Sequence, residues 1–143
     1  MITYSRLINP TIKDHAQLVR LIRQLSSAPR ELTLTDLHTT ALTHELVVAR
    51  DDELEGDIVG TALLVAMFSI SHVSGHIEDV VVDRMYRGRG IGRELTLQLI
   101  AHAREIGIER IDLCSEPERE AANRLYRSLG FAVRDTNLYR LKL

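Results

Sequence analysis

The stretch VVVDRMYRGRGIGR, residues 80–93, decides how the middle of this chain folds. The β-branched run at its start is typical of a strand buried on both faces. Three glycines at alternate positions then predict a tight turn, because glycine adopts positive φ angles with little strain. After the turn, apolar residues follow helical spacing up to a final glycine: Ile91, Leu95, Leu99, Ile106 and Gly107. The stretch therefore predicts a strand, a glycine-rich turn and a long helix in direct succession.

The glycine-rich turn is also basic. It contains Arg87, Arg89 and Arg93, and no acidic residue follows them before Glu94. The unbonded N–H groups and the dipole of the following helix converge on the same place. This combination predicts an anion site, with pyrophosphate as the natural candidate. A tight turn without a ligand is the simpler alternative, but it leaves the arginines without a partner.

Two common phosphate-binding patterns do not fit this turn. The dinucleotide-binding pattern G-x-G-x-x-G can start at Gly88 and Gly90, but its third glycine then falls on Arg93. The P-loop pattern G-x-x-x-x-G-K-[ST] occurs nowhere in the chain. A nucleotide-dependent oxidoreductase is therefore disfavoured.

The composition is that of an ordinary globular protein. The 143 residues are 45% hydrophobic and 27% charged, with a formal net charge of −2, which predicts a single domain over residues 1–143. The lack of a basic excess disfavours a nucleic-acid partner. Cys114 is the only cysteine, so we expect a reducing, cytoplasmic location. The longest apolar stretch, Ile58 to Ile70, is too short to cross a membrane.

The rest of the chain alternates between strand and helix patterns. Strands are expected at 2–8, 45–50, 58–68, 76–83, 110–115, 131–134 and 138–143. Besides the long helix, helices are expected at 13–25, at 35–42 with Thr35 as N-cap, and from the capping-box pattern Ser115-Glu116-Pro117-Glu118 to Leu129. The resulting order, β-α-α-β-β-β-α-β-α-β-β, predicts an α/β domain.

Two segments resemble a known family. Arg87, Gly90 and Gly92 form the pattern Arg-x-x-Gly-x-Gly, and EAANRLYRSLGF, residues 120–131, carries a tyrosine and ends in Leu-Gly-Phe. With the element order, both segments resemble the GCN5-related N-acetyltransferase (GNAT) superfamily, whose glycine turn binds the pyrophosphate of acetyl-CoA. The resemblance implies a mixed, mostly antiparallel sheet of about six to seven strands flanked by about four helices.

The resemblance further implies acetyl transfer from acetyl-CoA to a primary amine by direct attack, without a metal. It assigns acetyl-CoA binding to Val80, Val81, Val82, Arg87, Gly88, Arg89, Gly90, Ile91, Gly92, Arg93 and Asn123. The valines would pair through their backbone with the pantetheine arm, and an N–H near Val80 or Val81 would face the thioester oxygen. The family commonly has an asparagine seven residues before the tyrosine. This chain has Arg119 there, so contact by Asn123 or by Arg119 stays open.

The resemblance also implies the catalytic groups. Glu78, at the head of the strand, is the expected general base, acting on the amine through water, and Asp79 is its rival. An ideal strand places Glu78 on one face with Val80 and Val82, unless a β-bulge disturbs the alternation. Tyr126 matches the family's tyrosine near the CoA sulfur, where we expect it to donate a hydrogen bond as charge builds.

The sequence does not identify the acceptor amine. The strand HIEDVVVD, residues 76–83, locally resembles glucosamine-6-phosphate N-acetyltransferases, but the C-terminal half departs from them, so that substrate is not implied. A small-molecule amine and a peptide amine both stay open, as does a homodimer. The alternative function is a non-catalytic acetyl-CoA-binding module on the same fold. The presence of both Glu78 and Tyr126 favours an enzyme.

Overall fold

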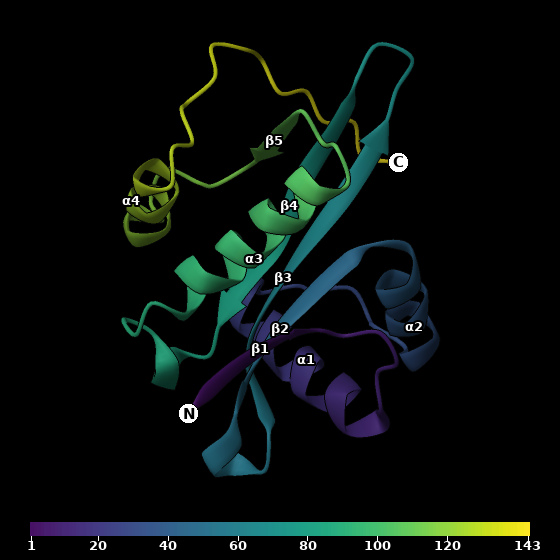
Figure 1. The fold of residues 1–143 in the computed structure, drawn as a ribbon, viewed down its shortest axis with the longest axis vertical. Coiled ribbons are helices and arrows are strands. Elements are labelled where there is room, and N and C mark those ends of the chain that lie inside the picture. Colours follow the sequence, from purple (N-terminus) through teal and green to yellow (C-terminus); the bar gives the residue numbers. More distant parts are fainter.

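The computed structural model describes all residues from Met1 to Leu143. Its centre is a five-stranded sheet in the order β1-β2-β3-β4-β5 (Figure 1). Neighbouring strands are antiparallel except for β4 and β5, which are parallel. The strands are β1 (Ile2–Arg6), β2 (Glu45–Asp51), β3 (Asp57–Phe68), β4 (Val73–Val82) and β5 (Arg110–Leu113). The predicted α/β class and mixed sheet are confirmed.

Four α-helices flank the sheet, as predicted. They are α1 (Ile12–Leu25), α2 (Leu34–Thr43), α3 (Ile91–Glu105) and α4 (Glu120–Ser128). Two 3₁₀ turns, η1 (Asp52–Leu54) and η2 (Arg84–Tyr86), follow β2 and β4. None of these helices combines the length and apolar composition that crossing a bilayer requires.

Two hydrophobic cores lie on opposite faces of the sheet. In β2, Leu46 and Val48 pack with residues of α1 and α2, whereas Val47 and Ala49 pack with residues of α3. This alternation is the period of two that an extended strand imposes. Because both faces are covered, β2 and most of β3 read as nearly unbroken apolar runs, as in sheets buried on both sides.

The predicted start of α2 is two residues too late. The N-cap is Thr33 rather than Thr35, because Thr33 forms a capping box with Asp36. The Thr33 hydroxyl accepts a hydrogen bond from the Asp36 N–H at 3.0 Å, and the Asp36 carboxylate accepts one from the Thr33 N–H at 3.1 Å. The pattern T-x-x-D was visible in the sequence, and it outweighs the later threonine.

The capping box predicted at Ser115-Glu116-Pro117-Glu118 does not form. Helix α4 begins at Glu120, and the Ser115 hydroxyl is buried without a hydrogen-bond partner. Instead, the Glu116 carbonyl accepts hydrogen bonds from the Arg119 N–H and from the Asn123 side chain, at 3.0 and 2.9 Å. These two bonds close a turn at the position where the prediction started a helix.

The two strands predicted at 131–134 and 138–143 are absent, so the sheet has five strands rather than six to seven. After Phe131, no backbone group joins a backbone hydrogen bond. In the view of Figure 1, the segment leaves α4 at the left, passes above β5 and ends at the right, lower than the turn between β3 and β4. The sequence has a strand pattern here, but the segment forms no backbone hydrogen bonds with any strand.

Candidate active site

One edge of β4 has no neighbouring strand along the valine run, Val80–Val82. Parallel pairing joins Ser74–Ile77 of β4 to Arg110–Leu113 of β5 and stops there. Beyond Ile77, the β5 side of β4 faces no strand. The backbone of Val80–Val82 is therefore available on one side to a ligand that can add to the edge like a strand.

A β-bulge lies directly at the predicted catalytic residues. Thr61 of β3 pairs with Val81, and Leu63 pairs with Glu78, so Asp79 and Val80 together stand opposite one residue. Asp79 has a φ of 54°, an unusual left-handed conformation for a residue other than glycine. Strained backbone of this kind is held only where the surrounding structure enforces it, and it is common at functional sites.

The bulge changes which side chains share a face of β4. Val80 and Val82 join Ile77 against the α3 core, whereas Val81 belongs to the α1–α2 core. Glu78 follows Ile77 and so points to the α1–α2 face, away from Val80 and Val82. The bulge thus disturbs the ideal alternation and turns the Glu78 carboxylate toward the helices α1 and α2.

The two carboxylates at the bulge have different surroundings. The Glu78 carboxylate lies 3.2 Å from Nε2 of His76. Neighbouring atoms crowd the Asp79 carboxyl and raise its pKa above the usual value, and the charge of Glu78 adds to this. Arg30, in the segment between α1 and α2, partly offsets the shift in the pKa of Asp79. The bulge therefore places two carboxylates next to each other, and the positive charge of Arg30 acts on Asp79.

The glycine turn presents a run of unbonded amides. Between Arg87 and Arg93, no backbone N–H donates to the protein, and the first bond of α3 runs from the Glu94 N–H to the Gly90 carbonyl at 3.1 Å. Gly88 and Gly90 make this geometry possible, with φ angles of 76° and 78°. Consecutive free N–H groups at a helix start form an anion-binding concavity.

The arginines of the turn have no acidic partner. Arg87 donates to the Val82 carbonyl at 3.1 Å, and Arg93 donates to the Ser128 hydroxyl at 3.0 Å. Arg89 donates to the Met85 carbonyl and stacks over the Tyr86 ring at 4.7 Å. None of the three forms an ion pair. Their full positive charges therefore add to the partial charges of the amides.

A buried carboxylate anchors the start of the turn to α1. Asp83 accepts hydrogen bonds from the Met85 N–H at 3.0 Å and from Arg20 at 2.7 Å. Gln24, one turn later on α1, bonds to both Asp83 and the Arg84 N–H. Burial opposes ionisation of Asp83, but these bonds outweigh it and hold the pKa below the usual value. The exit of β4 is thereby fixed relative to α1.

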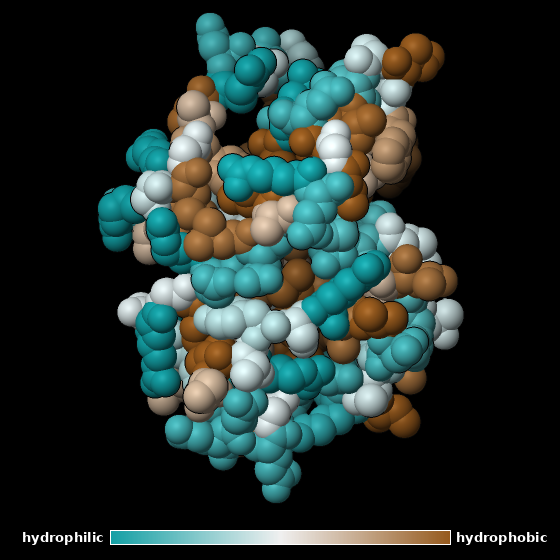
Figure 2. All heavy atoms as spheres, in the orientation of Figure 1, coloured by the Kyte–Doolittle hydropathy of each residue, from teal (hydrophilic) through white to brown (hydrophobic).

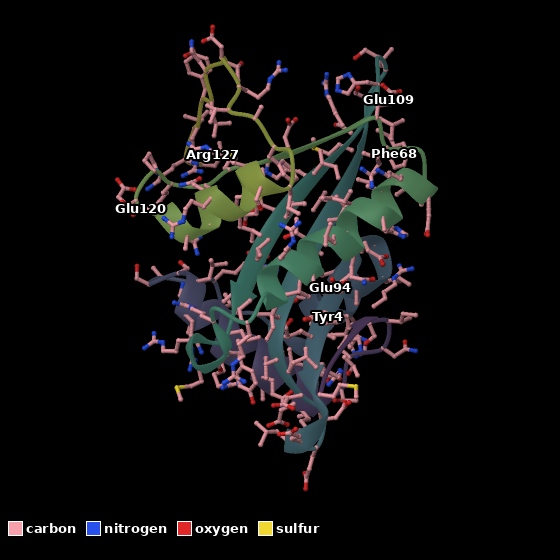
Figure 3. All side chains as sticks on the ribbon, turned by 60° about the vertical axis from the view of Figure 1, so that its left-hand side comes forward. Tyr4, Phe68, Glu94, Glu109, Glu120 and Arg127 are labelled. Carbon is pink, nitrogen blue, oxygen red and sulfur yellow. The ribbon has the colours of Figure 1, made fainter.

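Helix α4 brings Tyr126 to the same region. A methyl group added to Gly92 would meet Val82 of β4 and Leu125 of α4, each at 3.6 Å, so these three residues adjoin. Figure 3 shows α4, which carries Glu120 and Arg127, next to α3, which carries Glu94. The Tyr126 ring packs edge-on against Phe131 with centroids 5.9 Å apart. Burial raises the pKa of the Tyr126 phenol, and the charge of Arg119 reduces the shift.

The remaining candidates divide into bonded and free groups. The Asn123 side chain is engaged with the Glu116 carbonyl, whereas Arg119 lies close enough to Tyr126 to influence its pKa. Cys114 is exposed. No group of three or more His, Cys, Asp or Glu side chains lies close enough to hold a metal ion.

Sequence reasoning missed three features of the site. Arg30 gave no signal, because it lies in an irregular segment whose path is set by tertiary packing. The bulge at Asp79 depends on the register with β3, which a single strand does not encode. The anchoring role of Asp83 had a signal, since an aspartate directly after a strand often caps the next turn.

Comparison with known proteins agrees with this geometry. Residues 16–131 match the acetyltransferase (GNAT) family. A probable glucosamine 6-phosphate N-acetyltransferase 2 of Oryza sativa subsp. japonica is 32% identical over 137 residues, covering 87% of this chain and 80% of that protein. A mycothiol acetyltransferase of Nocardiopsis dassonvillei is 44% identical over 64 residues, or 45% of this chain. The match spans only 19% of that longer relative.

Solved structures share the fold over nearly the whole chain. A Trypanosoma brucei acetyltransferase superposes with a TM-score of 0.81 at 28% identity, over 100% of both chains. An aminoglycoside acetyltransferase from an uncultured soil metagenomic sample gives 0.84 at 21% identity, over 99% and 96% of the two chains, a likeness in fold alone. The unpaired edge of β4, the amide-lined turn and the match over residues 16–131 lead to one conclusion: this chain belongs to the acetyltransferase (GNAT) family.

Proposed function

We propose that this protein is an acetyl-CoA-dependent N-acetyltransferase that acts on a primary amine of a small molecule or peptide. One observation carries the proposal: the open backbone edge of Val80–Val82 leads directly into the unbonded amides of residues 87–93. An edge that can pair with an amide-bearing arm, followed by an anion site, matches the chemistry of CoA, which joins pantetheine to a pyrophosphate.

The residues present fit acetyl-CoA as a co-substrate. The backbone amides of residues 88–92, which include Gly88, Gly90, Ile91 and Gly92, would surround the pyrophosphate. The side chains of Arg87, Arg89 and Arg93 would add charge-assisted hydrogen bonds. Bound acetyl-CoA would supply the thioester, and the backbone of Val80–Val82 would position the pantetheine arm by pairing with it. A backbone N–H at Val80 or Val81 would donate to the thioester oxygen as negative charge develops there.

The acceptor amine must lose a proton before it attacks. A lysine-like amine has a pKa of about 10.4, so it is mostly protonated at neutral pH. In the proposed mechanism Glu78 takes this proton through a water molecule, and His76 at 3.2 Å passes it onward. Asp79 binds the ammonium group. Its raised pKa makes it the alternative base, because a base works best when its pKa approaches the working pH.

The leaving thiolate needs a donor, and Tyr126 is the proposed one. The pKa of its phenol is raised by burial, so the hydroxyl keeps its proton throughout the neutral range. It therefore donates a hydrogen bond to the sulfur as charge builds, rather than giving up its proton completely. Arg119 and Asn123 are the proposed further contacts of the cofactor on this helix.

The acceptor is proposed to be a small cationic amine, with amino sugars among the first candidates. Glu78 and Asp79 supply negative charge at the bulge, and Arg30 supplies a positive charge nearby. An acceptor that carries both an ammonium and an anionic group suits this arrangement. The named function of the rice relative agrees with such an acceptor but belongs to that protein.

Calorimetric titration with three ligands tests the cofactor part of the proposal. CoA contains pantetheine and pyrophosphate, pantetheine lacks the pyrophosphate, and NADH has a pyrophosphate without pantetheine. We expect measurable binding of CoA alone, because it engages both the strand edge and the turn. Equal binding of NADH, or no heat with CoA, would contradict the proposal. CoA binding without turnover on any amine would indicate the non-catalytic module instead.

A further inference from the structure

Arg89 differs from the other arginines of the glycine-rich turn in what holds it. Its guanidinium stacks over the Tyr86 ring, 4.7 Å from the ring centroid, and it donates a hydrogen bond to the Met85 carbonyl at 3.1 Å. Both contacts are made to η2, the 3₁₀ turn that precedes the glycines. An arginine over an aromatic ring is attracted by the negative charge of the ring face. The Arg89 side chain is therefore held in place although it is exposed.

The Tyr86 ring is itself fixed by two contacts. It packs against the core beneath α3, and its hydroxyl donates a hydrogen bond to the Asp51 carboxylate at 2.6 Å. Asp51 is the last residue of β2 and is only 7% exposed. A hydrogen bond to a carboxylate is stronger than one between neutral groups, and it pushes electron density into the phenol ring. Asp51 therefore fixes the ring and strengthens the attraction of the ring for Arg89.

The Asp51 carboxylate is also held in one orientation. One of its oxygens accepts from Tyr86, and the other accepts from the Glu53 N–H at 3.1 Å, at the start of η1. Its backbone lies in a strand that pairs with β1 on one side and β3 on the other. The hydrogen bond from Tyr86 is the main cause that lowers the pKa of Asp51, and the charge of Arg89 adds to this shift. At neutral pH the Tyr86 hydroxyl thus donates to a charged carboxylate.

The contacts from Asp51 through Tyr86 to Arg89 end at the proposed cofactor site. Arg89 stands between Gly88 and Gly90, whose positive φ angles shape the run of unbonded amides. In Figure 2, teal and white spheres occupy the left edge of the lower half of the molecule, where Figure 1 draws this turn and η2. A free arginine side chain loses conformational freedom when it binds an anion. An arginine already held by a ring loses less, so it binds a phosphate more tightly.

We propose that Asp51 is a positioning residue for acetyl-CoA: through the Tyr86 ring it holds the Arg89 guanidinium ready for a phosphate of the cofactor. The inference rests on the proposed function, because it requires the glycine-rich turn to bind CoA. A simple charge effect has the opposite sign. A negative charge near an anion site repels the anion, so charge alone predicts that removing the Asp51 carboxylate would tighten CoA binding. Positioning predicts that its removal weakens CoA binding.

Calorimetric titration of the full-length protein with CoA tests the direction of the effect. Tyr86→Phe removes the hydroxyl and keeps the ring, and Asp51→Asn removes the charge and nearly keeps the shape. Each should weaken CoA binding about two- to tenfold, the cost of ordering one freed side chain, and raise KM for acetyl-CoA with kcat unchanged. The matched controls are Tyr4→Phe, whose ring packs against the same core, and Asp52→Asn, the neighbouring carboxylate. Both controls should bind CoA like the wild type.

A double-mutant cycle separates positioning from a general loss of structure. Arg89→Ala should weaken CoA binding about tenfold or more, because a charge-assisted hydrogen bond to a phosphate is lost. Adding Asp51→Asn or Tyr86→Phe to Arg89→Ala should cause no further loss of CoA affinity, since no arginine is left to position.

Two results would overturn this inference and leave the proposed function intact. One is additive losses of CoA affinity in the cycle, and the other is CoA binding by Asp51→Asn that equals or exceeds that of the wild type. A wild-type protein that does not bind CoA would overturn both the inference and the proposed function.

Discussion

Tyr126 combines a half-buried ring with a hydroxyl that stays protonated. Its ring packs against Phe131, and burial raises the pKa of the phenol. A phenol of this kind is a poor acid toward a thiolate, because the thiol of a cysteine has a pKa of about 8.5. At neutral pH, Tyr126 is therefore expected to stabilise the thiolate by donating a hydrogen bond rather than by transferring its proton.

Replacing Tyr126 by phenylalanine should separate binding from chemistry. The ring contact with Phe131 is kept, so CoA affinity and thermal stability should change little. Loss of the donor should lower kcat by roughly 10²-fold, at the lower end of general-acid effects. Steady-state kinetics measure this, with Tyr4→Phe on β1 as the matched control. A Tyr126→Phe enzyme with normal kcat would remove the phenol from the mechanism.

Glu78→Gln and Asp79→Asn should have unequal effects. If Glu78 is the base, its amide should lower kcat/KM by about 10²-fold and remove the acidic limb of the pH profile. Asp79→Asn should mainly raise KM for the amine, because an ammonium partner is lost. The profiles of kcat/KM against pH for both variants decide the matter. The reverse ranking would make Asp79, with its raised pKa, the base.

At the scale of elements, side-chain hydrogen bonds anchor the junction of β4, η2 and α3 to neighbouring elements. Asp83 holds the exit of β4 to α1, and the Tyr86 hydroxyl donates to Asp51 of β2 at 2.6 Å. Between these anchors and α3, Gly88 and Gly90 take positive φ angles. The turn is thus held at both ends while its amides stay free.

Two glycine substitutions should act in opposite ways on stability. Gly90→Ala forces alanine into a φ of 78° and should cost about 1–2 kcal/mol of unfolding free energy. Gly92 is helical, and an added methyl would make ordinary 3.6 Å contacts with Val82 and Leu125, so Gly92→Ala should stabilise by about 0.5–1 kcal/mol. Urea unfolding measures both changes.

The same Gly92→Ala variant should nevertheless weaken CoA binding. Its methyl group would stand between β4 and α4, where the proposed cofactor path leaves the valine edge for the turn. Calorimetry should show a lower affinity for CoA in a protein that unfolds at higher urea concentration. Unchanged CoA affinity in this stabilised variant would place the cofactor elsewhere.

The elements that could be predicted from sequence are those with local signals. The valine run, the glycines and the apolar stripe of α3 lie next to one another, so strand, turn and helix followed from the residues alone. The features that failed depend on distant partners. Residues 138–143 have a strand pattern but pair with no strand. At Ser115 the predicted helix start does not form, because the hydrogen bonds to the Glu116 carbonyl close a turn there instead. Pairing partners and competing turns are tertiary properties.

At the scale of the whole molecule, buried carboxylates join the α1–α2 layer to the sheet. Asp14 of α1 accepts from Arg50 of β2 at 2.8 Å, and Asp83 accepts from Arg20 at 2.7 Å. Burial opposes ionisation of both carboxyls, but hydrogen bonds outweigh it, so both pKa values lie below the usual range. Helix α1 and the sheet are therefore linked by carboxylate charges that exist only above the folded-state pKa values.

Acid should accordingly weaken the fold in a defined window. A depressed folded-state pKa gives stability that is complete above the unfolded value of about 3.9 and is lost as the pH falls below it. Asp83→Asn should cost about 1–3 kcal/mol at neutral pH and show a shallower loss in acid, so the two curves converge. Urea unfolding from pH 7 downward measures this, with exposed Asp52→Asn as control. Parallel curves would show that Asp83 does not contribute through its charge.

The most direct test of the central claim is release of free thiol from acetyl-CoA in the presence of a panel of amines. The panel should include amino sugars with and without a phosphate, polyamines, amino acids and a peptide with a free amino terminus. An acetyl-CoA-dependent N-acetyltransferase predicts thiol release that depends on one class of amine, with a matching acetylated product by mass spectrometry and a strong loss in Tyr126→Phe. Thiol release with no amine dependence, or none with any amine although CoA binds, would contradict it.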